Sequence, residues 1–415
     1  MSAHTVATND PLAKVSVKTS HGTVHLPAHQ AQNQVVPAME IVKQYSATTT
    51  GSWSSYSEFS LTSDQLPHIV DTVTVAIALG AGSATASSYV ALAGDANFLF
   101  KSIELYVGPT LISTLYDLNG YFQELAHYTC EAKFKNLTAA GNATLANRKT
   151  AGASAQVLYL NLPIPWLCKK TGWLSAQAST AFRIRLYHQD LSTVILTDGT
   201  APAMPINSVT LDVAGRNFMS QASVGAHVAN QRKLGVVSSR FLDPIAQQIV
   251  LPSGSSSYTF QLTNMLGNFS HMFFVIRLQS SVGTPLGNAQ TAFLPCASYA
   301  LNDSAGNIIV PTLPSLYATN VVLGRYVTGD MTDIAGVLGS TGTPKTVYPL
   351  IFSSNPEKAL FDGSAHGYLR LDGLSKLTLN FASSQSAALV VDFVGYVQAQ
   401  LNSDSTGAVS KVLVQ

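Results

Sequence analysis

Short runs of aromatic and β-branched residues recur along the whole chain, and they limit its possible folds more than any other feature. Examples are TVTVAIAL (72–79), FLFKSIELYV (98–107), AFRIRLYH (181–188) and MFFVIRLQ (272–279), several of which alternate apolar and polar residues. Gly, Pro, Asn, Asp and Ser separate the runs, as expected at turns. Many short strands predict an all-β sandwich or barrel rather than alternating βαβ units.

Two pairs of segments in different halves of the chain resemble each other. VGPTLISTLY (107–116) is similar to IVPTLPSLY (309–317), and both VLYLNLPIPW (157–166) and TVYPLIFSSNP (346–356) place a strand before a Pro-bearing loop. Apolar residues at near-helical spacing predict helices over 112–129 and 313–329. The sequence therefore indicates two copies of one β-domain, each with a short helix in a connecting loop.

The length of 415 residues is too great for one ordinary hydrophobic core. We predict an N-terminal polar arm over 1–50, a first β-domain over 51–225, a second over 226–400 and a C-terminal tail over 401–415. The central boundary rests on the segment SQASVGAHVANQRKLG (220–235), which has no apolar period.

Charge is scarce in this chain. Asp, Glu, Lys and Arg make up 11% of it, against roughly a quarter in typical soluble proteins, and the formal net charge is +1. The absence of a basic stripe argues against specific nucleic-acid binding. No signal peptide is expected in the first twenty-five residues, and the most apolar window, 68–94, is too interrupted for a transmembrane helix. A surface with so few charges favours an obligate assembly.

Several residues could carry chemistry, and a structural role is expected for each. Cys130, Cys168 and Cys296 are widely spaced, which predicts buried free thiols. The cluster His21, His25 and His29 has no acidic or Cys partner nearby, so a solvated arm is expected instead of a metal site. The stretch GVLGSTGTPKT (336–346) resembles a phosphate-binding loop, but Pro344 replaces a required Gly.

The segment LIFSSNPEKALFDGSAHGYLRLDGLSKLTLNF (350–381) gathers acids and an arginine that could form an acid/base site. Glu357 follows Pro356 in a loop, and Asp372 precedes Gly373, a pair typical of hairpin turns. We therefore interpret these acids as turn formers. Arg370 alternates with leucines, so it is expected to face away from the apolar side and to pair with a nearby acid.

Three blocks of the chain resemble the double jelly-roll major capsid proteins of the lineage that joins tectiviruses, adenoviruses, nucleocytoplasmic large DNA viruses and virophages. They are SIELYVGPTLISTLYDLNGYFQELAHYT (102–129), VLYLNLPIPWLCKKTGWLSAQASTAFRIRLYH (157–188) and the segment 350–381. The positions that match in order are Gly108, Tyr121, Phe122, Glu124 and Leu125, then Trp166, Cys168 and Lys169, then Pro356, Glu357, Gly363, Ser364, Tyr368, Arg370 and Asp372. Pro109 departs from the family, in which a second Gly is usual.

The resemblance implies a structural protein without catalytic, cofactor-binding or metal-binding residues. It implies two tandem eight-stranded jelly rolls and a homotrimer that forms a pseudo-hexameric capsomer of an icosahedral shell. The expected partners are neighbouring capsomers, penton and minor capsid proteins and, in many members, an internal membrane. The expected location is the virion, after assembly in the host cytoplasm. Two alternatives stay open: a β-sandwich carbohydrate-binding or adhesin module, and a hydrolase that uses Glu357 and Asp372.

Overall fold

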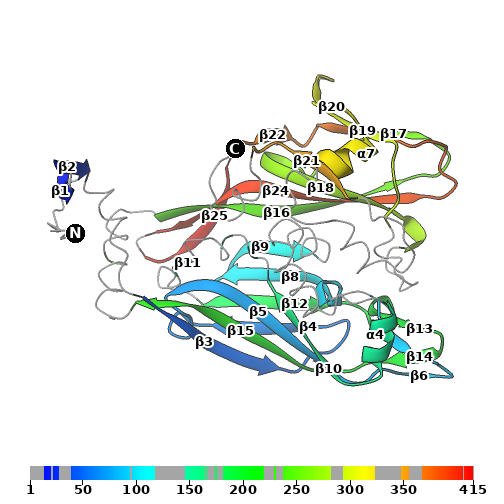
Figure 1. Cartoon of the computed structure of the whole chain (residues 1–415), viewed down its shortest axis with the longest axis horizontal. Coiled ribbons are helices and arrows are strands. Elements are labelled where there is room, and N and C mark those ends of the chain that lie inside the picture. Colours follow the sequence, from blue (N-terminus) through cyan, green and yellow to red (C-terminus); the bar gives the residue numbers. More distant parts are fainter. Residues whose placement is uncertain are drawn as a thin grey trace.

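A computed structural model describes most of the chain. The described residues are 14–19, 22–27, 39–93, 96–116, 145–162, 164, 166, 173–174, 181–218, 229, 237–281, 293–322, 347–354, 367–404 and 406–414. They form antiparallel sheets with a few short helices, in two β-sandwiches that lie side by side (Figure 1).

The first sandwich contains eight main strands. They are β3 (Met39–Thr49), β4 (Tyr56–Leu61), β5 (Ile69–Leu79), β8 (Phe100–Val107), β9 (Thr110–Tyr116), β10 (Gln156–Asn161), β12 (Phe182–His188) and β15 (Ile206–Phe218). One sheet has the order β10-β5-β15-β3, with β11 (Trp173–Leu174) also paired to β5, and the other has the order β4-β12-β8-β9.

The second sandwich repeats this plan. Its strands are β16 (Val237–Leu251), β17 (Ser257–Gln261), β18 (Leu266–Leu278), β19 (Ser298–Asn302), β20 (Ile308–Pro314), β21 (Tyr348–Ile351), β22 (Leu369–Asp372), β23 (Lys376–Asn380), β24 (Leu389–Ser403) and β25 (Val409–Leu413). One sheet has the order β16-β24-β18-β21, to which β22 and β25 add, and the other has the order β17-β23-β19-β20.

The two sandwiches share one strand order. When the eight main strands of each are numbered along the chain, with β21 and β22 together as the sixth, strands 1-8-3-6 form the first sheet and strands 2-7-4-5 the second. This interleaved order is that of a jelly roll. The predicted all-β fold of two tandem eight-stranded jelly rolls is therefore confirmed.

The sequence repeat also falls on equivalent strands. The shared Pro-Thr-Leu sequence lies at or just before β9 and within β20, which are the fifth strands of their jelly rolls. The second pair of segments forms β10 and β21, which are the sixth strands. The local similarity therefore marks corresponding parts of a duplicated domain.

The predicted helix over 112–129 is wrong for its first residues, because residues 112–116 belong to β9. Gly108, with φ of 59°, turns the chain so that Thr110–Tyr116 pairs antiparallel with β8. The β-branched residues Ile112 and Thr114 suit this strand. Residues 117–129 lie outside the described part.

Both jelly rolls nevertheless carry a helix between their fifth and sixth strands. In the first it is α4 (Leu145–Gly152), and in the second it is α7 (Ser315–Tyr317) followed by a π-helical turn, η5 (Ala318–Val322). The second helix lies within the predicted range 313–329. None of the described helices combines the length and apolar character needed to cross a bilayer.

Strand ends differ from the predicted domain limits at both ends of the chain. β3 lies in the range interpreted as a polar arm, yet it pairs with β15 in the first jelly roll. At the other end, β25 lies in the range interpreted as a tail, yet it pairs with β24. The division near residue 225 stays a prediction that fits the end of β15 at Phe218 and the start of β16 at Val237.

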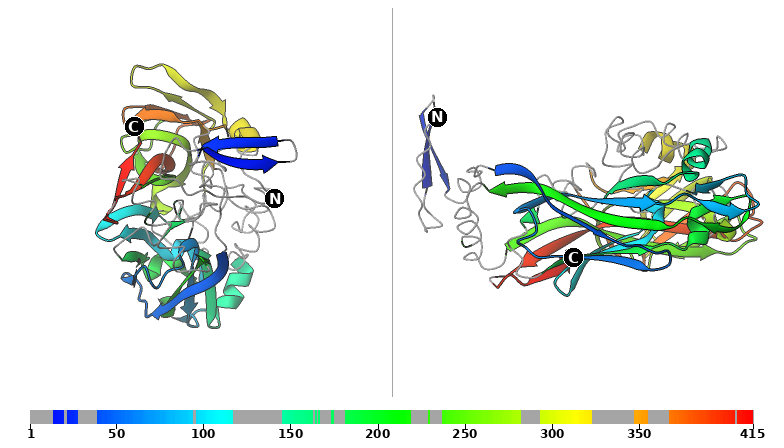
Figure 2. Two further views of the ribbon diagram at one scale, coloured as in Figure 1. Left: turned by 90° about the vertical axis from the view of Figure 1, so that its left-hand side faces the viewer. Right: turned by 90° about the horizontal axis from the view of Figure 1, so that it is seen from below.

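Smaller elements decorate the sandwiches. They are the hairpin β1 (Lys14–Thr19) with β2 (Gly22–Pro27), the short strands β6 (Ser83–Thr85), β7 (Val90–Leu92), β13 (Ile195–Thr197) and β14 (Thr200–Ala203), the helix α5 (Leu191–Val194), and the 3₁₀ turns η1 (Ala96–Leu99) and η3 (Gln279–Ser281). The hairpin β1–β2 stands apart from both sandwiches (Figure 2).

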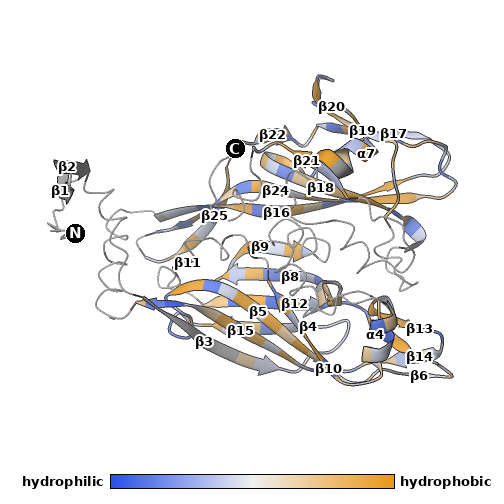
Figure 3. Ribbon diagram, in the orientation of Figure 1, coloured by the Kyte–Doolittle hydropathy of each residue, from blue (hydrophilic) through white to orange (hydrophobic). Residues whose placement is uncertain are grey.

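Each jelly roll has its own core, and apolar residues concentrate on the strands of both (Figure 3). In β12 of the first jelly roll, buried and half-exposed residues alternate, as expected for a sheet with one solvated face. β18 and most of β24 are instead buried on both faces. The first sheet of the second jelly roll is therefore an internal layer of the chain.

Candidate functional site: the junction between the jelly rolls

The two jelly rolls meet where β9 of the first contacts β16 and β25 of the second (Figure 1). Ser113 Oγ donates a hydrogen bond to Asp243 Oδ1 at 2.6 Å, and Thr110 Oγ1 donates one to the carbonyl oxygen of Val409 at 3.1 Å. Lys411 Nζ forms an ion pair with Asp243 Oδ2. Three strands from both domains are thus joined through one carboxylate and one carbonyl.

Asp243 is buried at this junction, with 3% of its surface exposed. Burial raises the pKa of its carboxyl above the ordinary value, while Lys411 and Ser113 act in the opposite direction. A buried carboxylate needs such partners, because an unpaired buried charge is costly. Asp243 therefore fixes the relative position of β9, β16 and β25.

Apolar packing continues this contact. Phe241, Ala399 and Leu401, from β16 and β24, belong to the hydrophobic cluster of the first jelly roll. Val409 and Leu413, from β25, pack against the same cluster, and Leu413 also contacts the second core. The last strand of the chain therefore closes the junction from the side of the second jelly roll.

A groove of about 360 Å³ lies beside the junction. Its lining residues are Leu111, Ser113, Thr114, Tyr116, Asp243, Pro244, Ile245, Ala246, Asn264 and Lys411. Both jelly rolls contribute, and among the described lining residues the only acid is Asp243, which is already paired with Lys411. The described lining therefore offers no second carboxyl group for acid/base chemistry.

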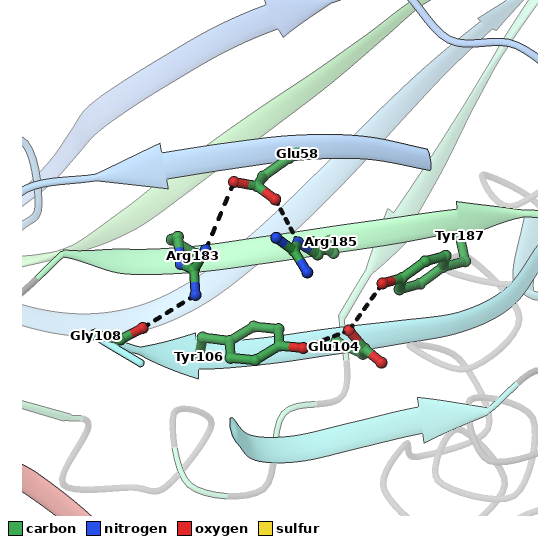
Figure 4. A network of polar contacts seen from close by, with 7 residues as sticks. All are labelled: Glu58, Glu104, Tyr106, Gly108, Arg183, Arg185 and Tyr187. Carbon is green, nitrogen blue, oxygen red and sulfur yellow. Dashed lines mark hydrogen bonds and ion pairs between the residues drawn. The ribbon is translucent and has the colours of Figure 1, made fainter. Parts of the chain in front are cut away.

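The outer face of the sheet β4-β12-β8 carries a polar network (Figure 4). Glu58 forms an ion pair with Arg185, and its other oxygen lies 3.9 Å from Arg183 Nη1. Arg183 Nη2 also donates a hydrogen bond to the carbonyl oxygen of Gly108 at 3.2 Å. The two arginines are thereby held flat on the sheet.

The same network extends onto β8. The hydroxyl groups of Tyr106 and Tyr187 donate hydrogen bonds to Glu104 Oε2 at 2.7 and 3.1 Å (Figure 4). Both guanidinium groups lie near the Tyr106 ring, 4.9 Å from its centroid for Arg183 and 5.5 Å for Arg185. These residues pair their charges and hydrogen-bonding groups with one another, which is typical of a structural surface.

Asp372 is a turn former, as predicted from the sequence. Its Oδ1 accepts a hydrogen bond from the Leu374 N–H at 2.9 Å, and this bond lowers the pKa of the carboxyl below its ordinary value. The prediction of a hairpin is wrong, however, because β22 pairs with β18 in one sheet while β23 pairs with β17 and β19 in the other. The turn carries the chain from one sheet of the sandwich to the other.

Gly373→Ala tests this turn. Gly373 has φ of 74°, and an added Cβ would lie 3.1 Å from the Thr263 carbonyl oxygen. We expect a loss of about 1–3 kcal/mol in the free energy of unfolding, measured by urea denaturation. Gly254→Ala is the matched control, since Gly254 also has positive φ but nothing lies within 4 Å of the added Cβ. An equal loss in both variants would contradict the close contact at Gly373.

The other predicted residues are dispersed. Arg370 is exposed between half-buried Leu369 and buried Leu371, as predicted, and it takes part in no ion pair among the described residues. Trp166 is buried with its ring edge-on to Phe182. Cys296 is a buried free thiol whose pKa is raised by burial to about 11. His25 lies in β2.

Some predicted positions lie outside the described residues, and they gather in four stretches of the chain. They are His21 and His29; Tyr121, Phe122, Glu124, Leu125 and Cys130; Cys168 and Lys169; and Pro356, Glu357, Gly363, Ser364 and the whole loop 336–346. The structure therefore neither brings Glu357 to Asp372 nor separates the two.

Sequence reasoning missed the junction residues Asp243 and Lys411. A lone acid within the apolar run RFLDPIAQQIVL (240–251) was a usable signal, since a charge at the centre of a strand needs a partner. The identity of that partner, about 170 residues away, has no local signal.

No family model and no curated protein matches the sequence. Solved structures do match over nearly the whole chain. PBCV-1 VP54, fitted into a reconstruction of the virophage Sputnik, matches with a TM-score of 0.64 and 12% identity over 92% of this chain and 98% of its own. The Faustovirus major capsid protein matches with a TM-score of 0.63 and 8% identity over 92% of both chains.

A chain of the Sputnik virophage also matches, with a TM-score of 0.54 and 11% identity over 99% of this chain and 93% of its own. At such low identities the likeness concerns the fold, and the full coverage shows that it includes both sandwiches. Together with the shared strand order, it confirms the structural side of the resemblance found in the sequence. The chain has the double jelly-roll fold of viral major capsid proteins.

Proposed function

We propose that this chain is a viral major capsid protein whose copies associate as homotrimers and tile an icosahedral shell as pseudo-hexameric capsomers. The observation that carries the proposal is that two jelly rolls with the same strand order stack so that unlike sheets meet. The second sheet of the first jelly roll contacts the first sheet of the second, through β9 and β16.

Such a contact is heterologous, because it joins two different surfaces of a repeated unit. Repetition of a heterologous contact produces either a closed ring or an open filament. Three copies with two jelly rolls each would close a ring with true threefold symmetry and nearly sixfold shape. That shape fills a surface with hexagonal tiles.

The chemistry of the described residues fits a structural role. No group of three or more His, Cys, Asp or Glu that could hold a metal ion occurs in the described part of the chain. Asp372, which the hydrolase hypothesis needs, is held by the N–H group of Leu374 in a turn. We propose a location in the virion after assembly in the host cytoplasm, with neighbouring capsomers, penton and minor capsid proteins and an internal membrane as partners, and no specific nucleic-acid binding.

The proposal predicts a trimer in solution. Purified full-length chain at micromolar concentration is expected to show three times the chain mass in size-exclusion chromatography with light scattering. Negative-stain images of that fraction are expected to show pseudo-hexagonal particles. A monodisperse monomer across the micromolar range would contradict the proposed function.

A further inference from the structure

His188, the last residue of β12, is enclosed in the core of the first jelly roll with 1% of its surface exposed. Its Nε2 lies 2.8 Å from the Ser57 hydroxyl oxygen of β4, and its ring centroid lies 5.3 Å from that of Phe100 on β8. Its Nδ1 is buried and has no hydrogen-bond partner among the described residues. Since either tautomer of the neutral ring leaves Nδ1 unsatisfied, this side chain carries a cost that an apolar residue would avoid.

Among the described residues, no charged group is placed to stabilise a protonated His188. Glu58 on β4 lies on the outer face of its sheet, where it pairs with Arg185 (Figure 4). Lys101 on β8 and Asp190 after β12 form an ion pair with each other at 3.1 Å, and both side chains are about half exposed. Burial therefore acts alone on the imidazole and lowers the pKa of His188 to about 4.

The connection between β3 and β4 covers His188, and we call its residues 50–55 the flap. Gly51 lies so close to the imidazole that an added Cβ would be 3.4 Å from His188 Nε2 and 2.8 Å from Ile206 Cγ2. Ile206 and Val209, which meet Gly51 from the other sheet, are apolar core residues. The flap therefore helps to shield the imidazole from water in apolar surroundings.

The flap is held closed by hydrogen bonds and contains a strained residue. Trp53 Nε1 donates to the carbonyl oxygen of Met204 at 2.6 Å. The N–H of Ser54 donates to the carbonyl oxygen of Gln189 at 3.0 Å, and Ser54 Oγ donates to Asp190 Oδ1 at 2.5 Å. Ser54 has φ of 60°, a conformation that is costly for a residue other than Gly and persists only where surrounding contacts hold it. Opening of the flap would release this strain, while the strands of the sandwich keep their pairing.

We propose that the flap is an acid-released switch, in which protonation of His188 moves residues 50–55 away from the end of the first jelly roll while both sheets stay folded. A protonated imidazole places a positive charge and a second N–H donor in an apolar core, so it is tolerated only when the flap opens and admits water. The backbone couples the two directly, because the N–H of His188 donates to the carbonyl oxygen of Ser55 at 2.8 Å. Opening exposes the indole of Trp53, which packs against the first core when the flap is closed.

The inference goes beyond the proposed function and does not require trimer formation. In a shell built from this chain, every copy would carry a surface segment that responds to an acidic compartment.

The sign and size of the pH dependence follow from the two states of His188. Its pKa is about 4 when the flap is closed, against an ordinary value of about 6.5 for an imidazole in water. The closed flap is therefore fully favoured above about pH 6.5 and loses this advantage as the pH falls towards 4. Between pH 7 and pH 5 the opening equilibrium is expected to increase about 20-fold. Hydrogen bonds from Ser54 and Lys101 hold the pKa of Asp190 below its ordinary value, so this carboxylate stays ionised over that range.

Hydrogen exchange of the full-length chain measures this opening, when it is followed by mass spectrometry and corrected for the chemical exchange rate at each pH. Peptides that cover residues 50–57 are expected to lose about 20-fold in protection between pH 7 and pH 5. Peptides from β15 are expected to keep their protection. His188→Gln carries an amide that can still bond the Ser57 hydroxyl but takes up no proton, so its flap is expected to be equally protected at both pH values.

His68→Asn is the matched control. His68 lies beside the far end of β15, where its Nδ1 accepts a hydrogen bond from the N–H of Phe218 at 3.0 Å, whereas the flap follows Thr49 beside Val209. The Asn side chain keeps an acceptor, so this variant is expected to retain the 20-fold change at the flap.

Three results would each overturn the inference. The first is flap protection in the native chain that does not change between pH 7 and pH 5, which decides the matter even if His188→Gln does not fold. The second is an equal loss of protection in β15, which would mean that the whole jelly roll opens. The third is the same 20-fold change in His188→Gln as in the native chain. The proposed function would stand in all three cases, because trimer formation is measured separately.

Discussion

A chain that ends after Asp404 is expected to keep both jelly rolls folded but to lose their rigid coupling. The truncation removes β25, and with it Lys411, the Val409 carbonyl that accepts from Thr110, and the Leu413 side chain that contacts both cores. Burial of a Val or Leu side chain is worth about 1.5–3 kcal/mol when complete. Because these two are only partly buried, we expect a total loss of about 3–5 kcal/mol, including the ion pair.

Calorimetry is the measurement that separates coupling from general instability. The full chain is expected to unfold in one transition and the truncated chain in two, because domains that share a small interface unfold independently. A chain that ends after Leu413 keeps β25 and serves as the control. A single, unshifted transition in the shorter chain would show that β25 does not couple the jelly rolls.

Lys411→Ala is expected to be nearly as damaging at neutral pH. It leaves the Asp243 carboxylate buried with only the Ser113 hydroxyl as a partner. Removal of one member of a buried ion pair costs about 3–5 kcal/mol. Because Lys411 is partly exposed, we expect about 2–3 kcal/mol, measured as a shift in the midpoint of urea unfolding.

The pH dependence of that loss follows from the pKa of Asp243. Burial raises this pKa in the folded state above its value in the unfolded chain, and loss of Lys411 raises it further. The folded variant therefore binds a proton more readily than the unfolded one, so its stability increases as the pH falls. We expect the loss in the free energy of unfolding of Lys411→Ala, relative to the native chain, to be largest near pH 8 and to shrink towards pH 5. Asp243→Asn with Lys411→Ala removes the charge, and its deficit is expected not to vary over this range.

The strands and their duplication could be read from the sequence because they depend on local patterns. AFRIRLYH alternates apolar and polar residues, and the structure buries Phe182, Ile184 and Leu186 while the arginines stay half-exposed. The similar sequences near residues 109 and 311 lie on equivalent strands because duplication preserves local sequence. These signals need no knowledge of the partner strand.

The sequence predictions are wrong where the structure of a segment depends on the distant strand or side chain that it pairs with. Residues 112–116 have apolar spacing that suits a helix, but pairing with β8 makes them a strand, since tertiary context overrides weak propensity. Asp372-Gly373 was correctly identified as a turn, yet the turn alone does not specify whether the next strand joins the same sheet. The pairing of Asp243 with Lys411 depends on the same kind of long-range information.

The burial of β18 on both of its faces has a consequence for synthesis. The ribosome releases β15 of the first jelly roll before any strand of the second, so the first jelly roll can fold while the rest is still being made. Until the second jelly roll is made, the sheet β4-β12-β8 of the first presents its arginines and glutamates to water. The outer surface of β18, which carries Phe273 and Val275 beside His271 and Arg277, emerges afterwards, when a folded first domain is already present. Because the first jelly roll is synthesised first, the chain avoids a long-lived intermediate in which β18 is exposed and prone to aggregate.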